Sequence, residues 1–182
     1  MDITKSKTEL RRKIKELKSS FSLNEKKDLS VSIFNNIEND DDFKKSKIVL
    51  AYWSMADEVH THDFVIKWSN KKKIYLPVVV GKELEFRLFT SISDMKKDSS
   101  FGIYEPIGES LVDFSKIDYA IIPGVAFDNN NNRLGRGRAF YDRILNSINA
   151  QKIGVCFDFQ MVEKVPTEST DIKMDKVYSN SL

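Results

Sequence analysis

The sequence predicts a single α/β domain with three layers, α/β/α, around a mostly parallel, Rossmann-like open sheet. Uniformly apolar runs, typical of strands buried on both faces, alternate along the chain with amphipathic segments of helical period. The 182 residues suffice for one hydrophobic core, and no repeat, low-complexity tract or linker divides them. We therefore expect one domain over residues 1–182.

Two helices are expected first. Residues from about 5 to 18 form a helix whose apolar positions at helical spacing are Leu10, Ile14 and Leu17. A Ser-Leu-Asn-Glu capping box at 22–25 starts the second helix, which the acidic segment 39–42 ends. Its inward-facing side chains are expected to be Leu29, Ile33, Phe34 and Ile37.

The remaining elements alternate between strands and helices. Thr61 is expected to cap a short helix carrying Phe64, Val65 and Trp68, and a further helix is expected over about 139–149. Residues 91–115 contain glycine and proline and are expected to form a long irregular surface connection. The predicted strands are 48–53, 74–79, 84–89, 117–122 and 151–157.

The composition is that of an ordinary soluble protein, with 41% apolar and 31% charged residues and a net charge of only +2. Cys156 is the only cysteine, so internal disulfides and multi-cysteine metal sites are excluded, and its apolar surroundings indicate a buried structural thiol. No segment approaches the ~18 apolar residues of a membrane span, and the lysine-rich start lacks an apolar signal core. We expect a cytoplasmic protein without a membrane partner.

The most informative segment is residues 133–143, which hold four arginines, two glycines and an aspartate. It follows an apolar run that Pro123-Gly124 stops, and a strand, a glycine-containing basic loop and a helix together favour phosphate binding. Asp142, just inside that helix, is a candidate magnesium ligand. The alternative is a solvated basic turn, and the loop matches neither G-x-G-x-x-G, because Phe140 replaces the last glycine, nor a P-loop.

Two further segments are candidates for ligand binding. Lys7 and Arg11 lie one helical turn apart, and they matter only if their helix folds back onto the arginine loop; otherwise they form a solvated basic face. Residues 53–58 follow a core strand at its carboxyl end. There a carboxylate can accept hydrogen bonds from a polar ring while Trp53 or Met55 stacks on it, although an ordinary acidic loop explains the segment equally well.

Two metal hypotheses have simpler alternatives. His60 and His62 would bind zinc only with carboxylate help from Asp57, Glu58 or Asp63, and polar residues near a helix start explain them better. A carboxylate of residues 166–171 or Asp175 could share a magnesium ion with Asp142, or the segment is a capped turn.

The strings 118–128 and 133–137, Asp-Tyr-Ala-Ile-Ile-Pro-Gly-Val-Ala-Phe-Asp and Arg-Leu-Gly-Arg-Gly, resemble those of the 5-formyltetrahydrofolate cyclo-ligase (methenyltetrahydrofolate synthetase) family. Three weaker motifs follow the family order, so the resemblance covers essentially the whole chain. They are Lys7-x-x-Leu10-Arg11, Ser54-Met55-x-Asp57-Glu58 and Pro166-x-Glu168-x-x-Asp171.

The resemblance implies a three-layer fold that uses ATP and Mg²⁺ to convert 5-formyltetrahydrofolate into 5,10-methenyltetrahydrofolate, with release of ADP and phosphate. It implies that Arg136 and Tyr141 act in catalysis and that Asp142 and Asp171 bind magnesium. The implied nucleotide contacts are Lys7, Thr8, Glu9, Leu10, Arg11, Arg133, Leu134, Gly135, Arg136, Gly137, Arg138, Ala139, Phe140 and Tyr141. The implied folate contacts are Trp53, Met55, Glu58, Arg136, Gly137, Arg138, Ala139 and Phe140.

Three positions depart from the family pattern. Ala139 stands where the family has glycine, Phe140 where it has tyrosine, and Thr170 where many members have histidine. The added Cβ of Ala139 would distort the loop if the backbone there needs a positive φ, and Phe140 loses a hydroxyl. Because the charged groups survive, we expect reduced rather than abolished activity.

Two other function classes remain as alternatives. One is a nucleotide- or folate-binding homologue with little turnover. The other is an RNA-binding module that uses the arginines with Tyr141 and Phe140 as stacking platforms, against which the nearly neutral net charge argues. The expected partner is a small-molecule substrate, without nucleic acid, and the expected state is a monomer.

Overall fold

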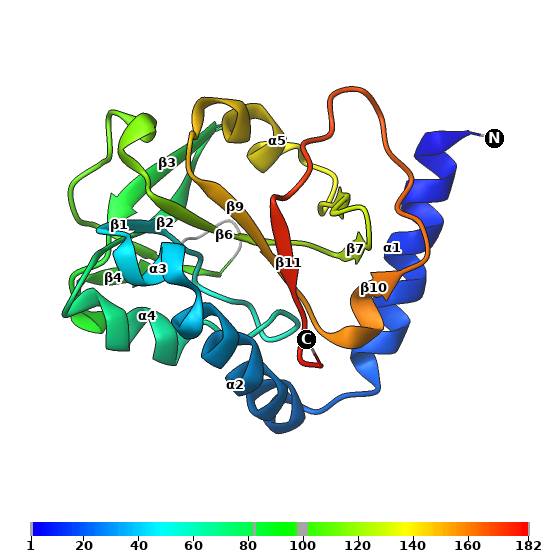
Figure 1. Cartoon of the computed structure of the whole chain (residues 1–182), viewed down its shortest axis with the longest axis horizontal. Helices are drawn as coiled ribbons and strands as arrows, with labels where there is room; N and C mark the ends of the chain where they lie inside the picture. Colours follow the sequence, from blue (N-terminus) through cyan, green and yellow to red (C-terminus); the bar gives the residue numbers. More distant parts are fainter. Residues whose placement is uncertain (1, 82, 98–101, 182) are drawn as a thin grey trace.

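The computed structural model describes residues 2–81, 83–97 and 102–181, and its centre is a six-stranded sheet (Figure 1). The strand order is β11-β9-β6-β1-β2-β3; all neighbours pair in parallel except β2 and β3, which are antiparallel. The mostly parallel sheet predicted from the sequence is confirmed. Its strands are β1 (Ile48–Leu50), β2 (Lys73–Val80), β3 (Glu83–Leu88), β6 (Tyr119–Pro123), β9 (Gln151–Val155) and β11 (Lys176–Tyr178).

Helices cover both faces of this sheet, because consecutive side chains of its strands point to opposite sides. Val49 belongs to the apolar core on one face and Leu50 to the core on the other, and both are fully buried. The first face is covered by α2 (Leu23–Asn39), α3 (Asp41–Lys45) and α4 (His62–Ser69). The second face is covered by α5 (Phe140–Ile144) and a 3-10 turn (Leu145–Ser147), so the three predicted layers are present and the second helical layer is thin.

A three-stranded sheet beside the main one supports the arginine loop. Its order is β10-β7-β8, formed by β7 (Ala126–Asp128), β8 (Arg133–Leu134) and β10 (Met161–Val162). The fully buried carboxylate of Asp128 accepts hydrogen bonds from the backbone N–H groups of Asn130, Asn132 and Val165 and thereby fixes the turn between β7 and β8. Helix α1 (Ile3–Ser19) packs on this sheet through Ile14 and lies at the same end of the molecule (Figure 1).

A hairpin of β4 (Met95–Lys97) and β5 (Tyr104–Pro106) stands in the segment expected to be irregular; residues 98–101 of that segment lie outside the described residues. It is attached to the main sheet, since the Glu105 carboxylate accepts a hydrogen bond from the backbone N–H of Val79 at 2.9 Å. The remaining 3-10 turns are Ile92–Asp94, Phe114–Lys116 and Asp158–Gln160.

Several local details differ from what the sequence pattern suggests. The helix expected over about 5–18 is confirmed as α1, but Leu17 is 38% exposed and the buried residues of the helix are Lys7, Ile14 and Lys18. The Thr61 side chain makes no capping bond to α4; its hydroxyl donates to the Tyr52 carbonyl. The acidic segment ends α2 as expected, but it also starts the short α3.

Other differences concern element lengths. The first core strand ends at residue 50 rather than 53, and the helix expected over 139–149 is helical only over 140–144 before a 3-10 turn. The predicted capping box of α2 is confirmed, with the Ser22 hydroxyl accepting from the Glu25 N–H and the Glu25 carboxylate accepting from the Ser22 N–H.

Candidate active site

A cavity of about 390 Å³ opens at the carboxyl ends of β1 and β6. These strands are neighbours, and the chain leaves β1 toward β2 on one side and β6 toward β9 on the other. Such a reversal of strand order is where open α/β sheets bind ligands, because the loops after the two strands diverge. The volume lies within the usual range for a small-molecule site.

The arginine loop forms one wall of the cavity, and Arg133 anchors it. The guanidinium donates from Nη1 to the Pro123 carbonyl at 3.1 Å and from Nη2 to Asp142 Oδ1 at 3.0 Å. It also lies 5.6 Å from the centroid of the Tyr141 ring. Its Nε is the one buried side-chain polar atom of the described residues that has no hydrogen-bond partner. Arginine is well suited to bind anionic groups, and Arg133 shares the cavity lining with Arg136 and Arg138.

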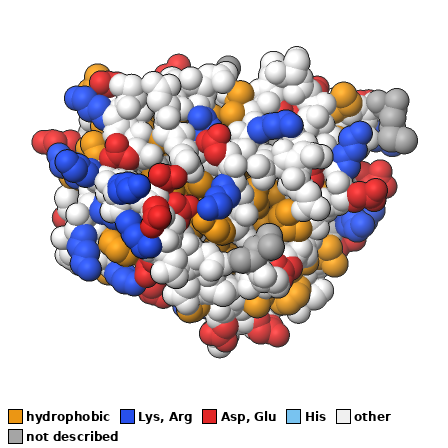
Figure 2. All heavy atoms as spheres, viewed as in Figure 1, with side chains coloured by type: hydrophobic (Ala, Val, Ile, Leu, Met, Phe, Trp, Pro, Cys, Tyr) orange, Lys and Arg blue, Asp and Glu red, His pale blue; other side chains and the backbone are white. Residues whose placement is uncertain are grey.

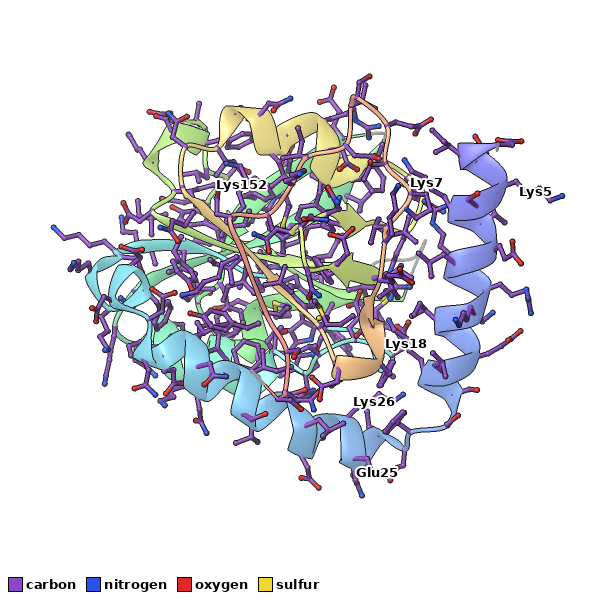
Figure 3. All side chains as sticks on the ribbon, turned by 45° about the vertical axis from the view of Figure 1, so that its right-hand side comes forward. Lys5, Lys7, Lys18, Glu25, Lys26 and Lys152 are labelled. Atoms are coloured by element: carbon purple, nitrogen blue, oxygen red, sulfur yellow. The ribbon has the colours of Figure 1, made fainter. Side chains whose placement is uncertain are left out.

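Helix α1 folds back so that Arg11 reaches the arginine loop and Lys7 reaches the carboxylates of Glu168 and Asp171. Lys7 Nζ binds Glu168 Oε2 and Asp171 Oδ2, both at 2.7 Å, and Arg11 Nε donates to the Gly135 carbonyl at 2.9 Å. Burial lowers the pKa of Lys7, but the hydrogen bonds and charges of Asp171 and Glu168 outweigh it, so the pKa lies above its ordinary value. Figure 3 shows Lys7 and Lys18 on the inner side of α1 and Lys5 on the outer side.

The loop after β1 forms the opposite wall and carries a fixed carboxylate. Glu58 has a side chain that is 10% exposed, and its Oε2 accepts from the Met55 N–H at 2.9 Å. Its Oε1 accepts from Arg136 Nη2 at 2.9 Å and from Nε at 3.2 Å. Asp57 Oδ1 accepts from the same Nη2 at 2.8 Å. Glu58 and Arg136, both predicted site residues, are therefore in direct contact.

Aromatic groups surround this carboxylate. Tyr52 and Tyr141 line the cavity, and burial, assisted by the negative charge of Glu58, raises the pKa of both hydroxyls. Both hydroxyls are therefore neutral at physiological pH, so Tyr141 can act as a hydrogen-bond donor but not as a phenolate base. The Trp53 ring stacks on His62 with centroids 3.8 Å apart.

An apolar slot completes the cavity, and the sequence analysis did not identify its residues. Pro77 and Val79 come from β2, Leu84 from β3 and Tyr104 from β5. The strand pattern indicated that β2 and β3 exist, but no local signal showed which of their side chains reach a ligand. A slot of this kind suits a flat ring or an aromatic linker.

The predicted metal ligands Asp142 and Asp171 each pair with a cation, Arg133 and Lys7 respectively. Across residues 2–81, 83–97 and 102–181 no group of three or more His, Cys, Asp or Glu side chains is arranged to hold a metal ion. His62 Nε2 instead lies 3.0 Å from the Ser54 carbonyl oxygen. The magnesium assignment stays a prediction.

Other predicted contacts occupy different surroundings. Thr8 and Glu9 lie on the exposed side of α1, whereas Leu10 and Leu134 pack in the core formed with Ile14, and their roles in nucleotide binding stay predictions. Cys156 is fully buried, and burial raises the pKa of its thiol to about 12, which confirms the structural interpretation.

Two loop positions have left-handed backbone. Gly137 has φ 98° and Ala139 has φ 51° with ψ 22°. The concern that residue 139 needs a positive φ is therefore confirmed. Glycine adopts this region without strain, whereas an L-residue does so at a cost. The loop thus keeps its course with a strained alanine just before α5.

Charges on the outer surface are mixed. Figure 2 shows basic side chains interspersed with acidic ones on the face that carries α2 and α3. Among the described residues, none of the helices combines the length and the apolar character needed to cross a membrane.

Comparison with known proteins places this site in context. The family model described as the 5-formyltetrahydrofolate cyclo-ligase family matches residues 3–180. A 5-formyltetrahydrofolate cyclo-ligase of Haemophilus influenzae is 27% identical over 179 residues, which is 94% of this chain and 96% of that protein. One of Escherichia coli K12 is 32% identical over 141 residues, which is 73% of this chain and 78% of that protein.

A solved structure agrees with these sequence matches. The NMR structure of the Aquifex aeolicus 5,10-methenyltetrahydrofolate synthetase superposes with a TM-score of 0.87 at 33% identity. The match covers 97% of this chain and 90% of that one.

Proposed function

The chain belongs to the 5-formyltetrahydrofolate cyclo-ligase family, an enzyme family, and from this premise we propose that it uses ATP and Mg²⁺ to convert 5-formyltetrahydrofolate into 5,10-methenyltetrahydrofolate. The single observation that carries the proposal is the cavity at the β1/β6 junction. There Arg133, Arg136 and Arg138 line the same cavity as an apolar slot and the Glu58 carboxylate. We further propose a monomer that acts in the cytoplasm on small molecules, without nucleic acid or membrane.

The cationic wall suits the phosphates of a nucleotide. Arg11 donates to the Gly135 carbonyl of the loop, Lys7 lies one helical turn before Arg11, and an added Cβ at Gly137 would lie 3.5 Å from the Arg11 guanidinium carbon. Charge-assisted hydrogen bonds from such groups are roughly twice as strong as neutral ones. Phosphate oxygens would replace the carboxylates that now pair with Lys7 and Arg133.

The same replacement would release the carboxylates for magnesium. Mg²⁺ is usually held by one or two carboxylates together with substrate phosphates and water, so Asp142 and Asp171 suffice without a third protein ligand. When bound, the ion would neutralise charge on the transferring phosphoryl group. The donor chemistry of the site therefore fits the metal.

The opposite wall suits a folate. The Glu58 carboxylate can accept hydrogen bonds from the amino and imide N–H groups of a pterin, and Trp53 and Met55 border the same part of the cavity. The apolar slot of Pro77, Val79 and Leu84 would take the aromatic linker. Because Oε2 of Glu58 is held by the Met55 N–H, the carboxylate is already oriented.

The proposed reaction begins with transfer of the γ-phosphoryl group to the formyl oxygen of the folate. That transfer leaves ADP. N10 then attacks the activated carbon, which closes the ring, and N10 gives up its proton to water; cleavage of the C–O bond to the phosphoryl group finally releases phosphate and leaves 5,10-methenyltetrahydrofolate. The protein contributes positioning and positive charge rather than a nucleophile, as is general for phosphoryl transfer. Arg136 can stabilise the developing charge, and the neutral Tyr141 hydroxyl can donate a hydrogen bond.

A second candidate, a binding homologue with little turnover, is favoured by the strained Ala139 in the phosphate loop. The two functions differ in whether ADP is released only when 5-formyltetrahydrofolate is present. In the first, ADP release requires the folate and equals the methenyl product formed. In the second, both ligands bind and neither product appears.

Lys7→Met tests the nucleotide site, and Lys5→Met on the outer side of α1 is its matched control (Figure 3). Loss of a charge-assisted hydrogen bond costs about 1.5–3 kcal/mol, so we expect the KM for ATP to rise roughly 10- to 100-fold in Lys7→Met. The control should stay within about twofold of the parent, since surface charges contribute little. ADP release without folate, or equal KM values in both folded variants, would contradict the proposal.

A further inference from the structure

Arg136 joins the two walls of the cavity and is held there by two carboxylates. Its Nη2 lies 2.8 Å from Asp57 Oδ1 and 2.9 Å from Glu58 Oε1. The Glu58 oxygen that Arg136 binds is the one not already taken by the Met55 N–H. Arg136 occupies both acceptor sites of Oε1, through Nε and Nη2, so a pterin that bonds both oxygens of Glu58 must displace Arg136.

The partners differ in how firmly they are placed. The Glu58 side chain is only 10% exposed and is bonded to backbone, whereas Arg136 lies between Gly135 and Gly137 and its side chain is 46% exposed. Gly137 has φ 98°, a conformation that glycine adopts without strain. Release of Arg136 requires rotation of one long side chain and no change in the core.

Asp57 is fixed from behind by helix α1. Lys18 Nζ lies 3.4 Å from Asp57 Oδ2, and the Lys18 side chain is only 7% exposed (Figure 3). Burial lowers the pKa of Lys18, although the charge of Asp57 opposes this shift. Asp57, Glu58, Lys18 and Arg136 form a group that we name the charge quartet, with two negative and two positive members.

The pKa shifts keep the contact between Asp57 and Arg136 ionic at physiological pH. Burial raises the pKa of Asp57, but the charges of Lys18 and Arg136 outweigh it and leave the pKa below its ordinary value. Burial lowers the pKa of Arg136, but the charges and hydrogen bonds of Glu58 and Asp57 outweigh it and leave the pKa above its ordinary value. Departure of Arg136 leaves two carboxylates facing one buried lysine, a state that favours ligand N–H donors.

We infer that Asp57 is a positioning residue that, together with Glu58, holds Arg136 in the cavity. When nucleotide binds, Arg136 moves to its phosphates, and Glu58 becomes free to bind the pterin. The two ligands therefore bind cooperatively. This inference rests on the proposed function. The nucleotide phosphates give Arg136 a new anionic partner in place of the Asp57 and Glu58 carboxylates. Without nucleotide, folate binding must break the contact between Arg136 and Glu58 unaided.

The cooperativity is reciprocal, because each ligand must change the affinity for the other by the same factor. We expect a non-hydrolysable ATP analogue with Mg²⁺ to lower the Kd for 5-formyltetrahydrofolate about tenfold, within the usual range for coupled sites. The folate should lower the Kd of the analogue by the same factor. Isothermal titration calorimetry with each ligand, in the presence and absence of the other, measures both factors.

Asp57→Asn keeps the size of the side chain and weakens the hold on Arg136. Its expected effect is a two- to fivefold lower Kd for folate without nucleotide and a coupling factor reduced to about two- to fourfold. Asp41→Asn, the same change at an 80% exposed side chain on α3, is the matched control and should retain the parent values. A merely structural role for Asp57 would weaken folate binding in both states and leave the ratio unchanged.

Arg136→Gln provides the second variant. In its background Asp57→Asn should no longer alter the Kd for folate measured without nucleotide, because the group that Asp57 positions is gone. An Asp57→Asn effect that persists there would overturn the inference, as would equal folate affinity with and without nucleotide in the parent protein. Failure of the folate to bind in either state would instead contradict the proposed function, so the two failures are distinguishable.

Discussion

The left-handed backbone of Ala139 predicts that Ala139→Gly stabilises the protein. An L-residue in this region costs roughly 1–2 kcal/mol, which glycine avoids. Glycine also gives the unfolded chain more freedom, which offsets about 0.4–1 kcal/mol of that gain. Because Ala139 is exposed, little buried surface is lost. The free energy of unfolding should therefore rise by roughly 0.5–1 kcal/mol, and Tm by about 1–4 °C for a chain of this size.

Thermal and urea unfolding followed by circular dichroism measure this change. Ala56→Gly is the matched control, because Ala56 is also exposed but does not have a positive φ. In Ala56→Gly no backbone strain is relieved, and glycine only increases the conformational entropy of the unfolded chain. The free energy of unfolding should therefore fall by about 0.4–1 kcal/mol. Opposite signs for the two substitutions support the reasoning. A destabilised Ala139→Gly, equal to the control, would refute the strain at Ala139.

Three further predictions concern the loop and the core. Ala139→Gly combined with Phe140→Tyr should raise turnover in the methenyltetrahydrofolate assay, and unchanged turnover with both KM values unchanged would show that these residues do not limit activity. Asp128→Asn should lower the free energy of unfolding at pH 7 by about 2–3 kcal/mol, since charge-assisted hydrogen bonds are lost. Burial raises the pKa of Asp128, but its hydrogen bonds lower it below the ordinary 3.8. The difference in free energy of unfolding between Asp128→Asn and the parent protein therefore has its full size above about pH 4. It should shrink as the pH falls through the lower folded value, and a difference independent of pH would contradict this account. Cys156 should not react with a thiol reagent at pH 8 in the native protein and should react once per chain in denaturant; rapid native reaction would contradict its burial and its pKa of about 12.

Long elements with a clear period were predictable from the sequence. The capping box and apolar spacing of α2 and the continuous apolar run of β6 are local signals, and they fixed the type of each element. The left-handed requirement at Ala139 was also anticipated, because glycine is the residue suited to such a position.

Short elements that depend on distant partners were not predictable. β8 and β10 each consist of two residues and exist because β7 lies between them. The helix after the arginine loop ends early, where the Ser147 hydroxyl donates to the Ile144 carbonyl and competes for a backbone acceptor, and a 3-10 turn follows. A polar side chain can also serve an unexpected partner, as Thr61 does in bonding the Tyr52 carbonyl instead of capping α4.

The residues of the candidate site also differ in whether the sequence could predict them. Arg133, Arg136 and Glu58 carry chemistry that the sequence makes visible, and the structure brings them to one cavity. The link from Lys18 to Asp57 spans two elements far apart in the chain, so no spacing rule connects them. Lysine on an amphipathic helix normally indicates a solvated face, and here the tertiary fold buries it instead.

The most direct test of the central claim is an absorbance assay for 5,10-methenyltetrahydrofolate with purified protein, 5-formyltetrahydrofolate, ATP and Mg²⁺. We predict product formation that needs both ATP and the metal, matches ADP release one to one and is lost in Asp142→Ala. Product formed without ATP, or no product while the two ligands bind, would contradict an ATP-dependent cyclo-ligase.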